Sequence, residues 1–252
     1  MKITIITVSY NAAKTIGDTL RSVREQSYQQ IEHIVIDGGS TDQTLDIVAA
    51  EGTHVAKVVS EKDEGLYDAM NKGLALATGD VVGFLNSDDV FANADVLTAV
   101  AQAMVEPSTD ACYGDLVYVA PDDTRKVIRY WRSREYERGL FERGWVPAHP
   151  TFYARRELYE RFGGFDLRLG LAADFDVLLR LIGVHGITTT YIPHVLVRMR
   201  LGGASNESLP SVIRQNVDIA RAFRKYGWKV GMKPFVFKMM LRISQFVRKP
   251  QS

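Results

Sequence analysis

The sequence has one cysteine, no long apolar run and almost no net charge. The lone Cys112 excludes an internal disulfide bond and is typical of a small buried residue in a reducing compartment. No apolar run reaches the roughly 18 residues of a membrane-spanning helix. The N-terminal segment is too short, and too polar afterwards, for a signal peptide. We therefore expect a cytoplasmic protein. Its net charge of +1 points to no class of partner.

Several nucleotide-binding motifs are also missing. There is no Gly-rich phosphate loop with Lys-Ser/Thr and no Gly-x-Gly-x-x-Gly after the first apolar run. No Cys/His cluster has zinc spacing. These absences argue against a P-loop NTPase, a dinucleotide enzyme and a zinc site. A basic stripe is lacking over most of the chain, which argues against nucleic acid.

The 252 residues are 46% hydrophobic and 24% charged, as in a globular α/β domain with or without an appendage. Apolar runs predict strands at 2–8, 33–36, 55–60 and from 80 onward, with helical spacing at 15–26, 44–50 and 66–77 between them. This alternation predicts an α/β fold with a doubly wound, mainly parallel sheet. Farther on we expect helices at 96–105, 155–162, 175–184 and 209–226 and strands at 111–119 and 188–197, while 125–143 has no clear pattern.

Carboxylates follow the predicted strands. Asp88 and Asp89 end the apolar run that begins at Asp80, and Asp37 ends the second strand before Gly38-Gly39-Ser40-Thr41. Ligands bind beyond the carboxyl ends of such strands, and paired carboxylates need a positive partner. Hard oxygen ligands suit Mg²⁺ or Mn²⁺. The alternative interpretation is a polar turn, with Asp88 or Asp89 capping the next helix.

Between these carboxylates lies the segment from Asp63 to Gly73. Asp68 and Asn71 are three residues apart and share a helix face near its start. The two side chains line the cleft in one interpretation and are solvated in the other.

The motifs together resemble family 2 glycosyltransferases with the GT-A fold, over about residues 1–205, and are similar to bacterial exopolysaccharide enzymes of the colanic-acid type. The matching segments are Thr7-Val8-Ser9-Tyr10-Asn11, Asp37 to Asp42, Asp63 to Gly73, Asn86-Ser87-Asp88-Asp89, His149 to Phe152, Gly163 to Asp166, Ala173 to Asp176 and Arg200 to Ser205.

The resemblance implies a donor site for a UDP- or GDP-sugar. The implied contacts are Thr7, Ser9, Asn11, Asp37, Asp63, Asp68, Asn71, Asp88 and Arg200. Asp37 would contact the nucleoside and Asp88 the ribose or sugar, with Asp89, together with Asp88, as ligand of Mg²⁺ or Mn²⁺. Arg200 either binds a phosphate group of the donor or lies on a solvated face of the protein.

On the acceptor side, Asp174 matches the family's catalytic base. It would deprotonate the acceptor hydroxyl in a single inverting displacement, with His149 lining that side and Asp176 in reserve. Two departures from the family pattern matter. Many relatives have a second Asp at the position of Gly38, which concerns the contact with the nucleobase. Many also have a Glu at the position of Ala173, so the role of catalytic base rests on Asp174.

We expect a catalytic domain at 1–205, with a nucleotide-sugar half to about 105 and an acceptor half from about 106 to 205. We expect residues 206–252 to form a basic, helical, amphipathic extension. After Asp218 the chain has no acidic residue, and apolar residues recur at helical spacing beyond Pro234. This pattern favours an anionic membrane surface, hence a peripheral protein on the inner face of the membrane, over packing on protein.

The predicted function is therefore a metal-dependent inverting glycosyltransferase acting on a saccharide, or lipid-linked oligosaccharide, acceptor in bacterial surface or exopolysaccharide synthesis. The alternatives are a sugar nucleotidyltransferase, which normally has a Gly-rich basic loop after the first strand, and a non-catalytic sugar-nucleotide-binding protein, which would not need Asp174.

Overall fold

The computed structural model describes residues 1–202 and 209–228. Their strands are β1 Ile3–Ser9, β2 Ile31–Asp37, β3 Val55–Ser60, β4 Val81–Phe84, β5 Val90–Phe91, β6 Ala111–Val119, β7 Val127–Trp131, β8 Tyr153–Arg155 and β9 Thr189–Arg200. The α-helices are α1 Ile16–Arg24, α2 Thr44–Glu51, α3 Leu66–Leu76, α4 Val96–Ala103, α5 Arg156–Phe162, α6 Ala173–Leu178 and α7 Leu209–Lys225. Shorter helical turns lie at η1 His149–Thr151, η2 Leu167–Ala172 and η3 Leu179–Val184.

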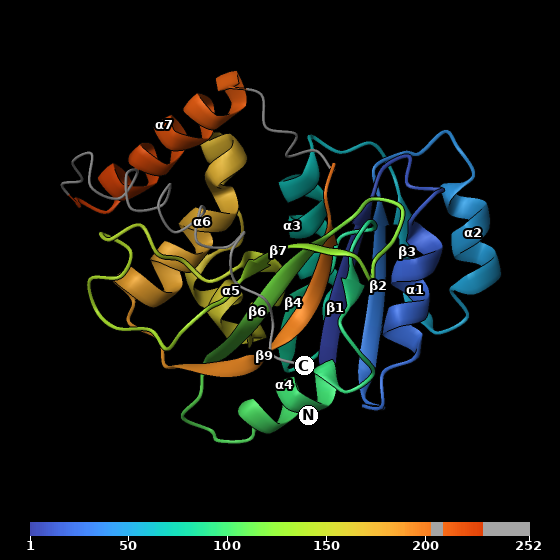
Figure 1. The fold of residues 1–252 in the computed structure, drawn as a ribbon, viewed down its shortest axis with the longest axis horizontal. Helices are drawn as coiled ribbons and strands as arrows, with labels where there is room; N and C mark the ends of the chain where they lie inside the picture. Colours follow the sequence, from blue (N-terminus) through green and yellow to red (C-terminus); the bar gives the residue numbers. More distant parts are fainter. Residues whose placement is uncertain (203–208, 229–252) are drawn as a thin grey trace.

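Within the described residues the strands form one sheet in the order β3-β2-β1-β4-β8-β6-β9-β5, with β7 paired to β6 (Figure 1). The first four strands are parallel, as the βα alternation predicts. Their register places Ser9 opposite Asp37 and Asp37 opposite Ser60. The polar residues that end three strands therefore share one edge of the sheet.

The second half of the sheet is mixed. β6 and β9 are parallel, whereas β8 and β5 join antiparallel. The sequence did not predict β5 and β8, because strands of two and three residues are too short to show a period. β9 runs beyond the predicted Val197 to Arg200, because it pairs with both β5 and β6. This extension brings Arg200 to the turn that contains Asp88 and Asp89.

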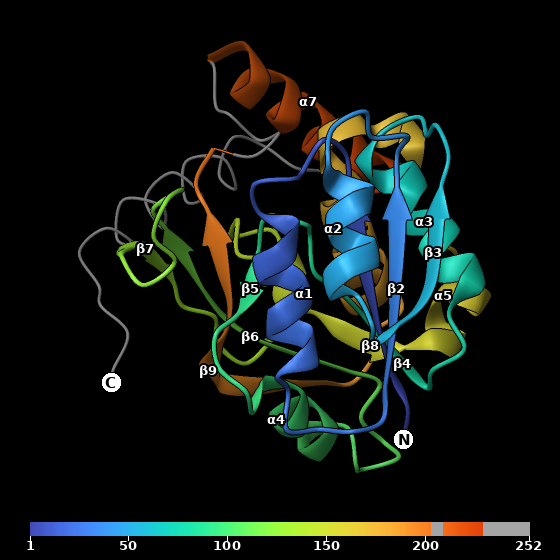
Figure 2. The ribbon, with the colours of Figure 1, turned by 90° about the vertical axis from the view of Figure 1, so that its right-hand side faces the viewer.

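Helices cover both faces of the sheet, so successive strand residues contribute to different core clusters. Ile34 and Ile36 of β2 pack with residues of α3, while Val35 packs with α1 and α2. Figure 2 shows α1 and α2 side by side over one face. Burial on both faces explains the continuous apolar composition of these strands.

The structure differs from the predicted elements in the second half of the chain. The unplaced segment 125–143 contains β7 followed by turns. The helix expected at 175–184 begins at Ala173 and becomes a π-helix from Leu179. None of the described helices is long and apolar enough to cross a membrane. The helix expected beyond Pro234 lies outside the described residues.

Candidate active site

Asp37 ends β2 inside a cage of hydrogen-bond donors. Its carboxylate is fully buried and accepts hydrogen bonds from the backbone N–H groups of Gly39 (3.1 Å) and Ser40 (2.9 Å). The hydroxyls of Ser9 (3.2 Å), Ser60 (2.7 Å) and Ser40 also donate to it. Burial acts to raise the pKa of Asp37, but these hydrogen bonds outweigh burial and hold the pKa below its ordinary value. Both oxygens are thus engaged within the protein, and Asp37 organises the loop that follows it.

Asp63 lies directly against Gly38. A Cβ on Gly38 would come within 2.4 Å of Oδ2 of Asp63, so a larger residue fits only if Asp63 moves. The other oxygen, Oδ1, accepts the Gly65 N–H at 2.9 Å. No further partner of Oδ2 is recorded in the part of the chain that the structure describes. The Asp63 carboxylate therefore occupies the space beside Gly38 that a side chain at this position would need.

Asp88 and Asp89 follow β4 as predicted. Asp89 is fully buried, and its Oδ1 accepts the backbone N–H of Arg200 at 3.2 Å. Burial raises the pKa of Asp88, and burial together with the Asp88 charge raises that of Asp89 well above its usual range. The buried Oδ1 of neighbouring Asn86 has no hydrogen-bond partner among the described residues.

This oxygen-rich corner fits a divalent cation. A cation would relieve the repulsion between the two carboxylates and supply a partner for the Asn86 oxygen. Among residues 1–202 and 209–228 no three His, Cys, Asp or Glu side chains gather as a metal site. The protein thus offers two carboxylates, which is the usual number where substrate phosphates complete the coordination of Mg²⁺.

Arg200 closes the corner from β9. Its guanidinium donates to the Asp88 carbonyl oxygen at 2.7 Å and forms an ion pair with Asp18 of α1. Its buried Nε has no partner within the described part of the chain. Arg200 therefore connects α1, β9 and the carboxylate turn, and retains one donor for an anion.

Asp174 lies in the first turn of α6, where the helix dipole favours a negative charge. The Asp174 charge lies close to the Tyr67 phenol of α3 and, after burial, helps to raise the pKa of that phenol well above its ordinary range. His149 of η1 is 7% exposed and packs against the rings of Phe84 and Phe165. Burial lowers the pKa of His149, an effect that the nearby Asp174 charge opposes. The buried Nε2 of His149 has no hydrogen-bond partner in the described residues.

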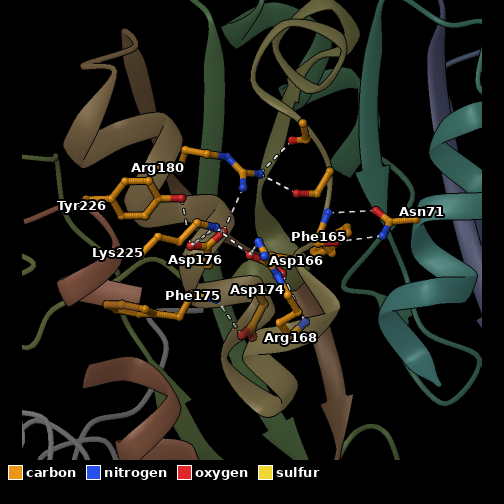
Figure 3. A network of polar contacts seen from close by, with 12 residues as sticks. Asn71, Phe165, Asp166, Arg168, Asp174, Phe175, Asp176, Arg180, Lys225 and Tyr226 are labelled. Atoms are coloured by element: carbon orange, nitrogen blue, oxygen red, sulfur yellow. Dashed lines mark hydrogen bonds and ion pairs between the residues drawn. The ribbon is translucent and has the colours of Figure 1, made fainter. Parts of the chain in front are cut away.

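Asn71 and Asp68 instead make contacts within the protein. The Asn71 amide donates to the Phe165 carbonyl (2.9 Å) and accepts the Phe165 N–H (2.8 Å), as Figure 3 shows. Asp68 accepts the Glu64 N–H at 3.0 Å and pairs with Lys72. These side chains hold α3 and its neighbouring loop, and their contact with the donor stays a prediction.

Asp176 is held within the protein. Its carboxylate is fully buried and is bonded to Arg180 (2.9 Å), Lys225 (3.1 Å) and Tyr226 (2.9 Å) (Figure 3). The Thr7 hydroxyl is likewise buried and is hydrogen-bonded to His33 at 2.9 Å. The predicted roles of Asp176 on the acceptor side and of Thr7 at the donor stay predictions, and local spacing could not show these internal partners.

Asn11 lies at the site's edge, where its Oδ1 accepts the Thr41 N–H at 2.9 Å and its own N–H donates to Ser40. It joins the loops after β1 and β2. The sequence also failed to single out Asp18, Ser60 and Tyr67. Tyr67 lies in the segment 63–73, between the predicted site residues Asp63 and Asn71. An aromatic residue at this position is equally typical of the hydrophobic core, so the sequence offered no reason to choose it.

Comparisons with known proteins agree with this geometry. The family described as "Glycosyl transferase family 2" matches residues 4–163. A PGL/p-HBAD biosynthesis glycosyltransferase of Mycobacterium bovis is 33% identical over 208 residues, which cover 80% of this chain and 78% of that one. An uncharacterized glycosyltransferase of Mycobacterium tuberculosis is 36% identical over 182 residues, covering 71% and 68%.

Solved structures share the fold. A mannosyltransferase of Pyrobaculum calidifontis in complex with GDP-Man and Mn²⁺ has a TM-score of 0.65 at 23% identity, covering 98% of this chain and 69% of its own. Glucosyl-3-phosphoglycerate synthase of Mycobacterium tuberculosis, in complex with Mn²⁺, UDP and glucosyl-3-phosphoglycerate, has a TM-score of 0.64 at 21% identity, covering 90% and 81%. The fold is therefore the GT-A fold.

Proposed function

The chain belongs to glycosyl transferase family 2 and is a glycosyltransferase, and from this premise we propose that it transfers a sugar from a UDP- or GDP-sugar to a saccharide acceptor with inversion. The observation that carries the proposal is the pair Asp88–Asp89 at the end of β4, with Asp174 on the neighbouring acceptor side. The family and this arrangement favour glycosyl transfer over nucleotidyl transfer and over binding without catalysis.

The donor lies along the carboxyl edge of β1, β2 and β4 in this proposal. Ser9, Asn11 and Asp37 shape the nucleoside corner, and Oδ2 of Asp63 accepts a hydrogen bond from a base N–H. Uracil and guanine both present such a donor. Arg200 Nε faces the diphosphate, because a guanidinium pairs well with phosphate.

Asp88 and Asp89 would hold Mg²⁺ or Mn²⁺ beside the diphosphate. The ion acts as a Lewis acid that stabilises negative charge on the leaving group when it is bound. Complexes of the structural relatives with Mn²⁺ support this assignment. Asn86 contributes its unpartnered oxygen to the same corner.

Asp174 removes the proton from the acceptor hydroxyl as general base. A bond forms between the acceptor oxygen and the anomeric carbon while the bond from that carbon to the diphosphate breaks. The diphosphate departs with the electron pair, and the proton moves to the Asp174 carboxylate. One displacement of this kind inverts the anomeric configuration. His149 Nε2 hydrogen-bonds a sugar hydroxyl on this side.

We further propose a lipid-linked acceptor in bacterial surface or exopolysaccharide synthesis and a peripheral place on the inner face of the membrane. The exposed face of α7 supports this. Ile213 and Val217 are 64% and 43% exposed there, next to the basic residues Arg214, Arg221 and Arg224. A helix of this composition suits an anionic lipid surface.

The test is transfer by the full chain from a panel of UDP- and GDP-sugars to a lipid-linked saccharide, with Mn²⁺, Mg²⁺ or chelator. Mass spectrometry identifies the product and NMR its anomeric configuration. The variant Asp174→Asn should keep nucleotide binding and lose about 10²–10⁴-fold in transfer, the usual contribution of a general base. A variant that keeps more than about a tenth of the wild-type rate would contradict the assignment of the base. A product with retained configuration would contradict the single displacement.

A further inference from the structure

A cavity of about 640 Å³ opens between the acceptor half of the chain and the end of α7. Its lining includes Tyr136, Arg138 and Glu142 from the turns after β7, Gly183 of η3 and Trp228 just beyond α7. None of these residues has a role in the site proposed above. Protein sites for small ligands commonly have a volume of about 300–1,000 Å³, so the cavity is large enough for a ligand of its own.

Three polar side chains line this cavity, namely Tyr136, Arg138 and Glu142. No hydrogen bond or ion pair of these side chains is recorded within residues 1–202 and 209–228. Arg138 and Glu142 carry opposite charges four residues apart without pairing in this part of the chain, whereas the nearby Arg134 pairs with Glu137 at 2.8 Å. A guanidinium only donates hydrogen bonds, a carboxylate only accepts them and a phenol does both. The three therefore retain matched donors and acceptors for a ligand.

Two aromatic rings complete the cavity and are held by the core behind them. Tyr136 stacks on Trp145 at a centroid distance of 6.3 Å, and Trp228 stacks on Phe223 at 5.8 Å. Both Tyr136 and Trp228 are only partly buried. Gly183 leaves room for the indole, since a Cβ there would come within 3.1 Å of Cη2 of Trp228. The cavity thus presents fixed aromatic surface beside its polar groups.

One continuous helical segment connects the proposed base to this cavity. α6 carries Asp174 in its first turn and continues as η3, whose Gly183 lines the cavity. At the rise of a helix, nine residues span roughly 10–15 Å. A layer of rings runs the same way, because Phe175 packs edge-on against Phe223 at 5.2 Å and Trp228 stacks on Phe223. This separation exceeds one sugar ring, so only a chain of sugars reaches from Asp174 to the cavity.

We propose that this cavity is a distal acceptor subsite, which binds a neutral sugar of an oligosaccharide whose reacting hydroxyl lies at Asp174. A pyranose has an apolar face of C–H groups, which packs on an aromatic ring, and a rim of hydroxyls that donate and accept hydrogen bonds. Tyr136 and Trp228 supply the rings, and Arg138 and Glu142 bind the hydroxyls.

The two opposite charges also define the class of ligand. A phosphate would meet the like charge of Glu142 and a cation that of Arg138, so the pair favours a neutral ligand. This inference rests on the proposed transfer to a saccharide, and it adds that the site selects acceptors by their length.

The first measurement is binding in the absence of a donor. Ligand-observed NMR titrates the full chain with neutral mono- to tetrasaccharides of glucose, galactose, mannose, rhamnose and N-acetylglucosamine. Wild type should bind the longer members of at least one series about tenfold more tightly than the monosaccharide. Glu142→Gln and Trp228→Ala should each remove this gain, as expected for loss of a hydrogen bond to a charged group or of a stacking ring.

The matched control is Glu137→Gln, whose carboxylate pairs with Arg134 and does not line the cavity, and which should keep the gain. Glu142 is exposed, so its substitution should leave the melting temperature unchanged and report on binding even where Trp228→Ala is destabilised.

Transfer kinetics provide the second measurement, with acceptors of increasing length that end in the same sugar. Lengthening the acceptor should lower KM with kcat nearly unchanged, because a distal subsite binds ground state and transition state equally. Glu142→Gln should remove this dependence on length. If affinity and KM are independent of length in wild type, or if both variants keep the dependence, the subsite is overturned and transfer stands. Length-dependent binding without transfer from any donor would overturn the proposed function instead.

Discussion

Asp89 illustrates how one residue can serve function at a cost in stability. Its carboxylate is fully buried next to Asp88, and both factors raise its pKa. Among the described residues no cationic side chain is hydrogen-bonded to it, because the Arg200 guanidinium is directed to the Asp88 carbonyl and to Asp18. A buried charge without a paired cation costs free energy of folding. Such a residue is better explained by a ligand than by the fold.

Asp89→Asn should abolish the gain in nucleotide affinity that Mn²⁺ provides. The neutral amide cannot balance the cation, whereas it fits the buried corner without the cost of a charge. Calorimetric titration of UDP and GDP, with Mn²⁺ and with chelator, measures this gain in wild type and variant. The melting temperature should be equal to or above that of wild type. A variant whose affinity still rises with Mn²⁺ would show that Asp89 is not the metal ligand.

At the scale of elements, helix α6 carries two carboxylates with different roles. Asp174 lies in the first turn of α6, while Asp176, two residues later, is directed toward Lys225 at the end of α7 (Figure 3). Arg180, one turn on, pairs with Asp176 and donates to the carbonyl oxygens of Gly163 and Gly164. α6 is thus fixed on one side by a buried ion network and is free to present Asp174 on the other.

Asp176→Asn should lower the free energy of unfolding by about 3–5 kcal/mol. The change leaves the buried Arg180 and the neighbouring Lys225 without their counter-charge, and breaking a buried ion pair typically costs this much. Denaturant unfolding measures the difference. The matched control is Asp123→Asn, whose exposed pair with Arg125 is screened by solvent and should contribute little to stability. If both variants lose equally little, the network does not fasten α6 to α7.

At the scale of the whole molecule, the C-terminal segment carries a concentrated positive charge, and we expect this charge to bind an anionic membrane surface. Residues after Gly231 include Lys233, Lys238, Arg242, Arg248 and Lys249 and no acidic residue. α7 precedes them and exposes Ile213 and Val217 beside basic side chains. Each basic residue near an anionic surface contributes about 1 kcal/mol, which salt weakens, whereas apolar burial resists salt.

A chain ending at Gly231 should therefore bind anionic liposomes much less than the full chain, while its melting temperature and transfer to a soluble acceptor persist. Flotation at low and high salt separates the two contributions. The full-length variant with Lys238→Gln and Arg242→Gln is the control for charge alone and should lose the salt-sensitive part. Full-length protein that remains unbound on anionic liposomes would favour packing on protein, and truncation should then lower the melting temperature instead.

The sequence alone determined the parallel half of the sheet and the acidic corner at its edge. Strand and helix periods are local, and parallel strands bring their carboxyl ends together, so Asp37, Asp88 and Asp89 could be predicted as neighbours from their positions after apolar runs. Local spacing likewise predicted the helix after Asp174, from residue 175, and the structure begins it two residues earlier, at Ala173. The resemblance to family 2 glycosyltransferases then implied a role in donor binding or catalysis for each of these carboxylates.

Only the tertiary structure decided which partner each polar side chain has. Arg200 meets the Asp88 carbonyl across 112 positions, and Asn71 meets Phe165 across 94. Asp176, two residues from Asp174, turned out to be a buried structural ion, and Thr7 an interior hydrogen-bond partner of His33. Hydrogen bonds between distant segments leave no period in the sequence. The direction of a side chain depends on what the fold packs against it, and this is why the partners of Asp176 and Thr7 emerged only in three dimensions.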